Sequence, residues 1–473
     1  MSALRYQFFE ELISPYLDEP FLLLESGASI RYRDFLQRSV RLLNHLVHQG
    51  ARHGDRVVVS LDNRPEYLEL AMALALGGMT LCPLDPEVSI AQLKKTKALC
   101  RAAMTITSYD QLAYAVDEAL PDCARQGGLD EPFLIIFSSG TTGAPKGIVQ
   151  TLKNFFGAAR AFALASGFAA GKVTLHNWPM FYNAGLFNLF ACPLVSGGRV
   201  ALAKRFAARD LAGFWQSLDL HKPDYVYLSP TMATTLTKTA RFIPHNPECL
   251  RAARVISTSS ILYPSIKEAF LKQFGAGIAP CFGITELGGS FSMGNADSAP
   301  YSVGRVMPEV AVSRDDEANG ELLVATPYMA LGYLNQDGEL DPFDRSQAFR
   351  TGDIGYLRDG ELFISGRIKD AIKKGGEFIN LAEIEDLVHG AGLCEECYAV
   401  GRLDEFWGET YDVFFVAGEG AQPTAVVDEL RRLFNASLPQ LQRPDRIVAV
   451  DSIPRTASGK PMKRLMRYQE GME

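Results

Sequence analysis

An α/β fold followed by a smaller C-terminal unit is the architecture that the sequence predicts, and three observations support it. Helix-like segments alternate with short apolar, strand-like runs between residues 32 and 274. Beyond about Gly320, short strand-like runs and turn residues replace this alternation, and an α/β pattern returns from Leu381 to the end. Such alternation is typical of largely parallel sheets flanked by helices. A domain boundary is expected near residues 366–370.

The elements can be followed in order along the chain. A helix is expected over 32–49, a strand over 55–61 and a second helix over 65–76, from the spacing of their apolar residues. Because helices separate consecutive strands, the strands are expected to pair in parallel. The same pattern continues with strands at 133–137, 224–230 and 253–260, a helix at 264–274, short strands within 320–327 and 353–366, and a helix at 381–390.

Composition places the chain among ordinary globular proteins. Its 473 residues are 47% hydrophobic and 22% charged, which is enough core-forming material for more than one domain. The formal net charge is -8, without the clustered positive charge that nucleic-acid binding needs. No nucleic-acid partner is therefore expected.

Neither a leader nor a membrane span is expected. Residues 1–14 carry acidic residues among the apolar ones and lack the basic segment and apolar core of a signal peptide. The apolar segment 68–81 is interrupted by Glu69 and two glycines and is followed by Pro83, so it is too broken to cross a bilayer. These features predict a cytoplasmic protein with no membrane partner.

The eight cysteines are scattered and are expected to be reduced. Only CEEC, residues 394–397, has the spacing of a metal or redox site. It lacks a second Cys/His pair and a thioredoxin-like context, so two incidental thiols are the favoured interpretation.

A run rich in glycine and hydroxyl residues, FSSGTTGAPKG at 137–147, follows an apolar strand-like run. Glycines allow close backbone approach, backbone N–H and hydroxyl groups donate to phosphate oxygens, and Lys146 adds positive charge. The spacing is not that of a P-loop, because Gly147 follows the lysine. A plain surface turn is the alternative. The candidate phosphate-binding residues are Ser138, Ser139, Gly140, Thr141, Thr142, Gly143 and Lys146.

Five further motifs follow this loop along the chain. They are CFGITE at 281–286, GELLVATPYMALGYLN at 320–335, FRTGDIGYL at 349–357, GRIKDAIKKGGEFINLAEIE at 366–385 and PRTASGKPMKR at 454–464. Together with the loop, and in this order, they resemble the signatures of the adenylate-forming superfamily, which includes acyl-CoA synthetases, nonribosomal-peptide adenylation domains and firefly luciferases. Because the motifs extend from the first third of the chain to its last turn, the resemblance covers essentially the whole sequence.

The resemblance implies both an architecture and a reaction. It implies a large N-terminal domain of α/β and β subdomains over 1–368, a hinge at Lys369, and a small, mobile α+β C-terminal domain over 369–473. The reaction is that of an AMP-forming acid–thiol ligase. A carboxylate attacks the α-phosphate of ATP to give an acyl-adenylate and pyrophosphate, and a thiol then displaces AMP.

The nucleotide-binding residues are carried over from the matched motifs. Asp353 is expected to accept bonds from both ribose hydroxyls, which suits a carboxylate, although an Asp that caps a turn is the alternative. Arg367 can donate to ribose and phosphate oxygens, as against a surface ion pair. Phe282 stands where tyrosine is usual and keeps a flat face for adenine beside Gly283.

The catalytic residues follow from the same resemblance. Glu286 is expected to hold Mg²⁺, a hard cation that prefers carboxylate oxygen, and Thr285 to contact the α-phosphate. Lys460 is expected to stabilise the charge that develops during adenylation, its alternative being a solvated tail lysine. Lys373 resembles the lysine that some relatives use in the second half-reaction, but a solvated loop lysine is equally open.

The acid pocket is where the sequence departs from its relatives. Tyr182 stands where many acyl-CoA synthetases have histidine, and Asn183 stands where amino-acid-activating relatives have aspartate. The segment STSSIL, residues 257–262, has serines where the family is usually glycine-rich, and Gly283 is also expected to contact the acid. An asparagine can donate and accept, which favours an aromatic or other compact acid with a polar group. Alternatively, Asn183 satisfies backbone groups of the wall.

Three functional hypotheses remain from the sequence, two of which differ in the thiol acceptor. A free CoA is favoured, and a stand-alone enzyme that loads the phosphopantetheine arm of a carrier protein is the alternative, because no carrier domain is fused. A non-catalytic nucleotide binder is disfavoured, since Lys460, Glu286 and Asp353 are all present. The identity of the acid and the oligomeric state are left open.

Overall fold

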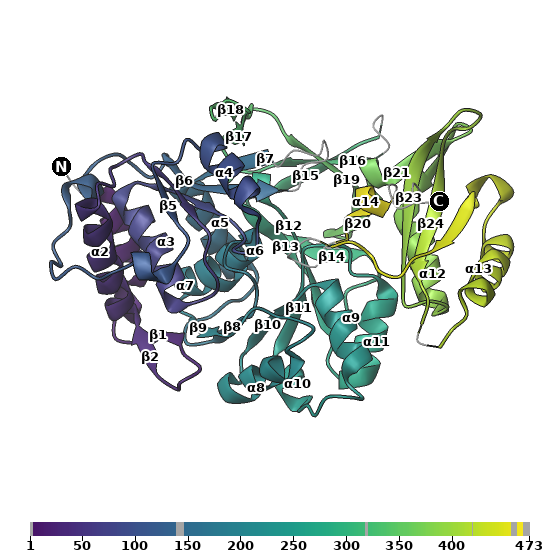
Figure 1. Cartoon of the computed structure of the whole chain (residues 1–473), viewed down its shortest axis with the longest axis horizontal. Helices are drawn as coiled ribbons and strands as arrows, with labels where there is room; N and C mark the ends of the chain where they lie inside the picture. Colours follow the sequence, from purple (N-terminus) through teal and green to yellow (C-terminus); the bar gives the residue numbers. More distant parts are fainter. Residues whose placement is uncertain (1–2, 139–145, 317–319, 419, 456–460, 467–473) are drawn as a thin grey trace.

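The computed structural model describes all residues except 1–2, 139–145, 317–319, 419, 456–460 and 467–473. Figure 1 shows an elongated molecule in which the sequence runs broadly from one end to the other, with the N-terminal helices at the left and the C-terminal strands and helices at the right. Within the described residues, the strands form three sheets, of seven, thirteen and five strands.

The seven-stranded sheet begins with the βαβ pattern that the sequence predicts. Strands β3, β4, β5 and β6 run parallel, with α3 between β3 and β4 and α4 between β4 and β5. Strands β7, β17 and β18 extend one edge in antiparallel pairs. The bounds are β3 Arg56–Val59, β4 Thr80–Pro83, β5 Met104–Ile106, β6 Pro132–Ser138, β7 Lys146–Thr151, β17 Gly332–Leu334, β18 Leu340–Pro342, α1 Leu4–Ile13, α2 Tyr32–His48, α3 Pro65–Gly77 and α4 Ile90–Leu99.

The thirteen-stranded sheet has a parallel half, ordered β1, β9, β8, β10, β11, β12 with β2 at its edge. Helices join its successive strands, as α/β alternation requires. The bounds are β1 Pro20–Leu23, β2 Ser29–Arg31, β8 Val173–His176, β9 Arg199–Leu202, β10 Tyr225–Leu228, β11 Arg254–Ser257, β12 Ile278–Ile284, α5 Leu152–Ala165, α6 Asn183–Leu186, α7 Cys192–Ser196, α8 Leu211–His221, α9 Pro230–Thr239, α10 Glu248–Ala252 and α11 Pro264–Phe274.

The other half of this sheet is antiparallel, and it begins earlier than the change expected beyond Gly320. Strand β13 already pairs antiparallel with β12, because the turn 285–288 between them is too short to hold a crossover helix. The bounds are β13 Gly289–Met293, β14 Ser302–Val306, β15 Ala311–Asp315, β16 Glu321–Ala325, β19 Phe349–Arg358 and β20 Glu361–Arg367.

The third sheet belongs to the C-terminal part of the chain. Its strands pack on α12 and α13 around a separate apolar cluster that includes Val388, Val413 and Leu430. A core of its own is what a separate small domain requires. The boundary between 368 and 369 remains a prediction. The bounds are β21 Ala371–Lys374, β22 Glu377–Asn380, β23 Glu396–Asp404, β24 Gly408–Val416, β25 Arg446–Ala449, α12 Leu381–Ala391, α13 Pro423–Ser437 and α14 Lys463–Met466.

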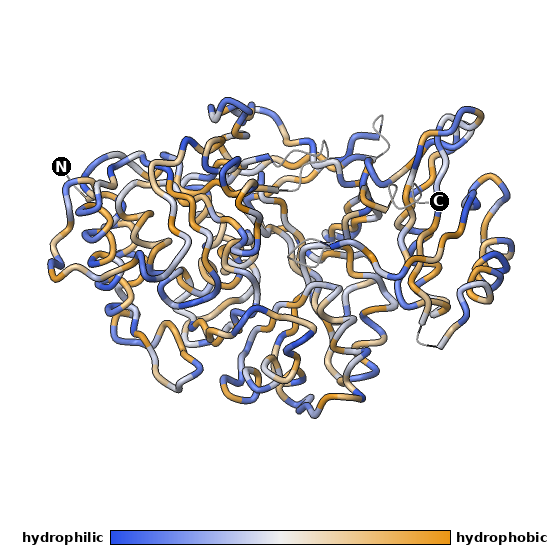
Figure 2. The backbone as a smooth tube through the Cα atoms, viewed as in Figure 1, coloured by the Kyte–Doolittle hydropathy of each residue, from blue (hydrophilic) through white to orange (hydrophobic). Residues whose placement is uncertain are grey.

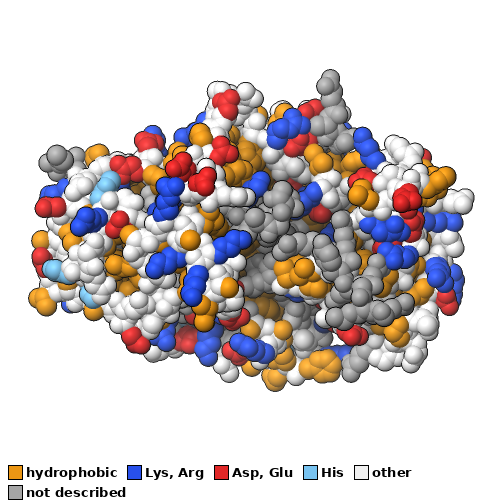
Figure 3. All heavy atoms as spheres, turned by 45° about the horizontal axis from the view of Figure 1, so that its top comes forward, with side chains coloured by type: hydrophobic (Ala, Val, Ile, Leu, Met, Phe, Trp, Pro, Cys, Tyr) orange, Lys and Arg blue, Asp and Glu red, His pale blue; other side chains and the backbone are white. Residues whose placement is uncertain are grey.

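The surface and the core fit the composition. In Figure 2 hydrophobic residues recur along the strands of the sheets, whereas the outer loops are mainly hydrophilic. Acidic and basic side chains are interspersed over the face shown in Figure 3. All eight cysteines lie in the described part of the chain and are free. Within the same residues, no helix combines the length and the hydropathy needed to cross a bilayer.

Candidate active site

A cavity of about 790 Å³ lies between the large domain and the C-terminal domain. On the large-domain side it is lined by the segment 257–263 after β11 and by the end of β12, so it lies at the carboxyl ends of parallel strands. This is the edge where ligands of open α/β sheets bind. Other lining residues are Asp353, Arg367 and Lys369 from the antiparallel strands and the segment after them, and Glu385, Tyr398, Arg455 and Lys463 from the C-terminal domain.

Asp353 and Arg367 are bonded neighbours that both line the cavity. They are register partners on β19 and β20, and Arg367 Nε donates to Asp353 Oδ1 at 2.6 Å. The carboxylate is 2% exposed and the guanidinium side chain is 37% exposed. The negative charge of Asp353 raises the pKa of Arg367. The Asp353 carboxylate is therefore buried and paired, whereas the Arg367 side chain is partly exposed, and the nucleotide roles of both residues remain predictions.

Phe282 and Gly283 follow one another at a β-bulge of β12. The register shifts between them relative to β13, a device that re-aims side chains beside functional sites. Both residues line the cavity, and the Phe282 ring is held edge-on by Phe291 at 5.4 Å between centroids. A Cβ atom at Gly283 would lie 2.4 Å from Ser290 Cα, so the position admits only glycine. The geometry leaves a flat aromatic face beside a bare backbone.

Glu286 is held by a tyrosine that the sequence did not reveal. The Tyr333 hydroxyl donates to Glu286 Oε1 at 2.9 Å, and Lys146 Nζ lies 4.8 Å from the centroid of the same ring. The two segments meet because β17 pairs with β7. Burial, and then the Glu286 charge, raise the pKa of Tyr333. The only sequence signal was its place in the 320–335 motif.

Backbone contacts fix the turn that carries Thr285 and Glu286. The Thr285 carbonyl accepts a bond from Gln150 Nε2, and the Glu286 carbonyl accepts one from the Ala330 N–H at 2.8 Å. Within the described residues, no group of three or more His, Cys, Asp or Glu side chains could hold a metal. A lone carboxylate fits Mg²⁺, which takes most of its ligands from phosphate and water.

Tyr182 and Asn183 lie where α6 begins. The Tyr182 ring stacks on Trp178 at 6.0 Å, and its hydroxyl lies 3.4 Å from Ser259 Oγ, which brings it to the serine-rich segment 257–262 as the sequence predicts. Ser259 has a φ of 84°, a conformation that is rare for residues other than glycine and is typical of functional sites. Asn183 Oδ1 is buried without a hydrogen-bond partner among the described residues.

Two further polar residues lie buried just before this segment, and the sequence did not mark them. Both polar atoms of the Asn177 side chain lack a partner in the described part of the chain. Burial lowers the pKa of its neighbour His176 to about 4, so this imidazole is neutral at pH 7. Buried polar groups are usually paired, and exceptions ask for an explanation such as a ligand.

Several predicted residues cannot be placed. Ser139, Gly140, Thr141, Thr142, Gly143 and Lys460 lie outside the described residues, as does the side chain of Ser138. The residues that flank 456–460 do line the cavity, on one side Arg455 and on the other Pro461 to Lys463. The described residues on both sides of 456–460 therefore lie at the cavity.

Lys369 and Lys373 lie in different surroundings. Lys369, within the one-turn helix Ile368–Asp370, lines the cavity, and burial followed by the charge of Arg367 lowers its pKa. Lys373 is exposed on β21 and is not among the residues that line the cavity; its backbone N–H donates to Glu409 at 2.7 Å. The hinge role of Lys369 and the second role of Lys373 remain predictions.

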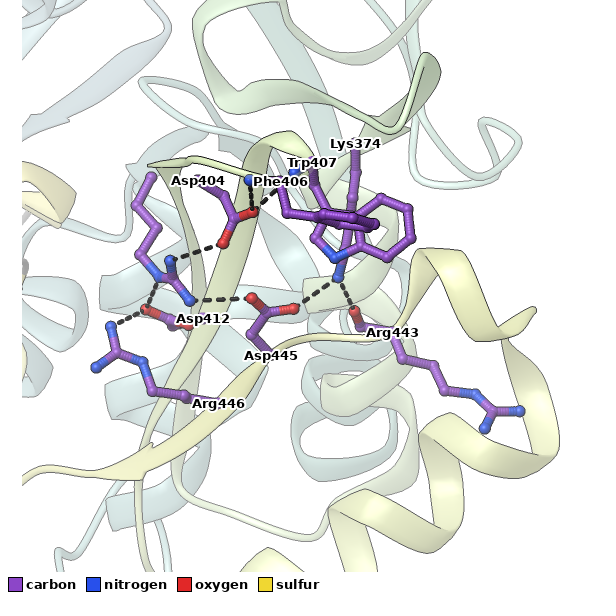
Figure 4. A network of polar contacts seen from close by, with 9 residues as sticks. Lys374, Asp404, Phe406, Trp407, Asp412, Arg443, Asp445 and Arg446 are labelled. Carbon is purple, nitrogen blue, oxygen red and sulfur yellow. Dashed lines mark hydrogen bonds and ion pairs between the residues drawn. The ribbon is translucent and has the colours of Figure 1, made fainter.

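The neighbouring Lys374 is structural. Figure 4 shows its side chain directed at Asp445 and at the backbone of Arg443, at 2.7 and 2.9 Å. The same network continues from Asp445 through Arg402 to the buried Asp412. The paired charges join strands of the C-terminal sheet to the segment 443–445. Lys373, in contrast, is exposed.

Comparison with known proteins places the chain in a family. Residues 9–334 match the AMP-binding enzyme family, and residues 383–460 match the AMP-binding enzyme C-terminal domain. A 2-succinylbenzoate–CoA ligase of Bacillus subtilis is 24% identical over 95% of this chain and 95% of its own. The fatty acid–[acyl-carrier-protein] ligase ScoC of Streptomyces coeruleorubidus is 28% identical over 95% of this chain and 93% of its own.

Solved structures share the fold. ATP-bound MatB from Rhodopseudomonas palustris superposes with a TM-score of 0.83 at 23% identity, covering 100% of this chain and 99% of that one. The Bacillus subtilis o-succinylbenzoate CoA synthetase, in complex with its acyl-adenylate intermediate, gives 0.79 at 21% identity, covering 98% and 97%. The predicted α/β fold with a large N-terminal and a small C-terminal domain is confirmed.

Proposed function

This chain belongs to the AMP-binding enzyme family of adenylate-forming ligases, and on that premise we propose that it joins an aromatic or other compact carboxylic acid to CoA. The observation that supports the site most directly is the cavity itself. Asp353, Arg367 and Phe282 of the large domain line it opposite Lys463, three residues after Lys460 in the chain. ATP-dependent formation of an acyl-adenylate is the first half of the activity.

In that half-reaction, the large domain binds and orients the nucleotide. Phe282 stacks on adenine, and Asp353, oriented by Arg367, accepts bonds from the ribose hydroxyls. A carboxylate oxygen of the acid then attacks the α-phosphorus, and the bond to the pyrophosphate oxygen breaks. Glu286 would hold Mg²⁺, which neutralises charge on the phosphates, and Lys146 and Lys460 supply the remaining positive charge.

In the second half-reaction, the thiol attacks the acyl carbonyl carbon and AMP leaves with the bridging oxygen. The C-terminal domain turns about Lys369 between the halves, so that a different face meets the same cavity. Lys373 suits such a role, because it is exposed on β21 and lies away from the cavity in this arrangement.

The acid is inferred from unpaired polar atoms in the segment 177–183, which does not itself line the 790 Å³ cavity. Asn183 Oδ1 and both polar atoms of Asn177 are buried without partners among the described residues, so an acid with a ring hydroxyl, amino or second polar group would complete them. The relatives include ligases for 2-succinylbenzoate, together with a feruloyl-CoA synthase from Amycolatopsis at 25% identity and a sulfoacetate–CoA ligase from Cupriavidus necator at 27%.

A panel of acids tests this proposal. Pyrophosphate release should be measured with benzoates, cinnamates and straight-chain fatty acids, followed by detection of the CoA thioester by mass. A compact acid with a polar substituent should give the highest kcat/KM. A maximum on medium or long fatty acids would contradict the acid that we propose and leave adenylation standing.

Carrier-protein loading is the second candidate, because one relative is a ligase that acts on an acyl-carrier protein. Both acceptors end in the same phosphopantetheine thiol, so the cavity alone does not separate them. The enzyme should be offered CoA and a phosphopantetheinylated carrier protein in parallel. A loaded carrier protein without any CoA thioester would make the carrier protein, and not CoA, the favoured acceptor.

A further inference from the structure

The two residues that flank the segment 456–460 pair with each other. Arg455 and Pro461 form an antiparallel bridge, and the Met462 N–H donates to the Pro454 carbonyl at 2.7 Å. Because these contacts join the two residues that flank the segment, whatever holds Arg455 and Lys463 also holds both of its ends.

An acidic residue of the C-terminal domain pairs with one basic residue on each side of the segment. Arg455 also contacts a hydroxyl of the large domain directly, whereas Lys463 reaches one only through its acid. On one side, Arg455 pairs with Glu396, and its Nη1 donates to Thr231 Oγ1 of α9 at 3.3 Å. On the other side, Lys463 Nζ donates to Glu385 Oε1 of α12 at 2.6 Å. The second of these contacts leads to the large domain through the carboxylate.

Glu385 is the centre of that second attachment. It is 2% exposed and accepts three bonds in all, from Lys463, from the Ala399 N–H of β23 at 2.8 Å and from the Tyr263 hydroxyl at 2.7 Å. Tyr263 follows directly on the cavity wall 257–262 and begins α11 of the large domain. One buried carboxylate thus joins both domains to the chain that carries Lys460.

We propose that Glu385 and Tyr263 are positioning residues which, through Lys463, hold residues 461–463, directly after Lys460 in the chain, at the cavity for adenylation. The inference rests on the proposed function, since it assigns Lys460 to that half-reaction. A buried charged hydrogen bond is strong and directional, so its loss displaces what it holds. The contact between Tyr263 and Glu385 must break when the C-terminal domain turns for thioester formation.

Tyr301 offers a matched control. Its hydroxyl also crosses from the large domain to α12, where it donates to Asp386, but Lys463 bonds to Glu385 and not to Asp386. Tyr263→Phe and Tyr301→Phe therefore each remove one hydroxyl that joins the large domain to α12, the first from the start of α11 and the second from the residue before β14. Only the first should affect residues 461–463.

The activity test separates the two half-reactions. Tyr263→Phe should slow single-turnover pyrophosphate release about 10-fold, the effect of removing one hydrogen bond to a charged group, and leave thioester formation from supplied acyl-adenylate unchanged. Lys463→Met should do the same, and the double variant should be no slower than Lys463→Met, because both act through Glu385. Wild-type adenylation by Tyr263→Phe, equal losses in both half-reactions, or losses that multiply in the double variant would overturn the proposal.

Amide hydrogen exchange of residues 461–466 tests the geometry without any substrate. Tyr263→Phe should raise exchange there, whereas Tyr301→Phe should leave it at the wild-type level. If no acid supports pyrophosphate release by the wild-type enzyme, the proposed function fails while this measurement still decides the attachment. Equal exchange in the wild type and Tyr263→Phe would refute it.

Discussion

The residues that we assign to the nucleotide and those that we assign to the acid differ in how their buried polar groups are paired. On the nucleotide side, Asp353 is paired with Arg367 at 2.6 Å and Glu286 with Tyr333 at 2.9 Å. On the acid side, Asn183 Oδ1, the Asn177 amide and Ser257 Oγ lack partners among the described residues. Preorganised groups serve a ligand that never changes, whereas unpaired ones are completed by a specific substrate.

The largest effect is expected where charge develops, at a residue that both sides share. Lys460→Ala should lower pyrophosphate release by a factor of order 10² or more with every acid, because a preorganised charge is lost. Thioester formation from a supplied acyl-adenylate should persist. An equal loss in both half-reactions would remove the division of labour between them.

A large and uniform effect is expected on the nucleotide side. Asp353→Ala removes the carboxylate that we propose as the acceptor for two ribose hydroxyls, and it leaves Arg367 without its partner, so kcat/KM for ATP should fall by roughly 10²- to 10³-fold. The order of preference among acids should not change. Asp445→Ala, which breaks an ion pair with Lys374 away from the cavity, is the matched control and should affect stability alone.

A smaller effect is expected at Tyr333, which acts through Glu286. Tyr333→Phe should lower kcat about 3- to 10-fold and raise the Mg²⁺ concentration needed for half-maximal rate, because the carboxylate loses its donor. Tyr328→Phe is the control, since that hydroxyl donates to Glu309 at the surface. An unchanged Mg²⁺ dependence would show that Tyr333 is only a packing residue.

The smallest effect on activity is expected from His176. Burial lowers its pKa from 6.5 to about 4, so below pH 6.5 the unfolded chain takes up a proton that the folded chain refuses until about pH 4. The free energy of unfolding should therefore decrease by about 3 kcal/mol as the pH is lowered from 6.5 to about 4. Urea unfolding of the wild type minus His176→Gln isolates the contribution, and a pH-independent difference would contradict it.

Local sequence patterns carried most of the fold and part of the site. Helices α2, α3 and α11 lie where apolar spacing predicted them. Asp353, Arg367 and Phe282, which the motifs singled out, line one cavity, and their roles remain predictions. These succeed because periodicity and motif order are properties of short segments.

Contacts between distant segments could not be read in the same way. The bond between Tyr333 and Glu286 depends on the pairing of β17 with β7, and the bond between Tyr263 and Glu385 depends on how two domains dock. The orphan amide of Asn177 became apparent only through its burial. Registers and packing decide such contacts, and neither is encoded in residue spacing.

The contrast between the two sides is tested most directly by one comparison of rankings. Pyrophosphate release should be measured over the same panel of benzoates, cinnamates and fatty acids for the wild type, Asp353→Ala and Asn183→Leu. We expect Asp353→Ala to lower kcat/KM for every acid by one common factor. Asn183→Leu should instead change the order of preference. It should shift the ratio of kcat/KM for the polar acid to that for its unsubstituted analogue by roughly 5- to 150-fold, because an unpaired buried amide costs about 1–3 kcal/mol. A ranking that Asn183→Leu leaves untouched would contradict this expectation.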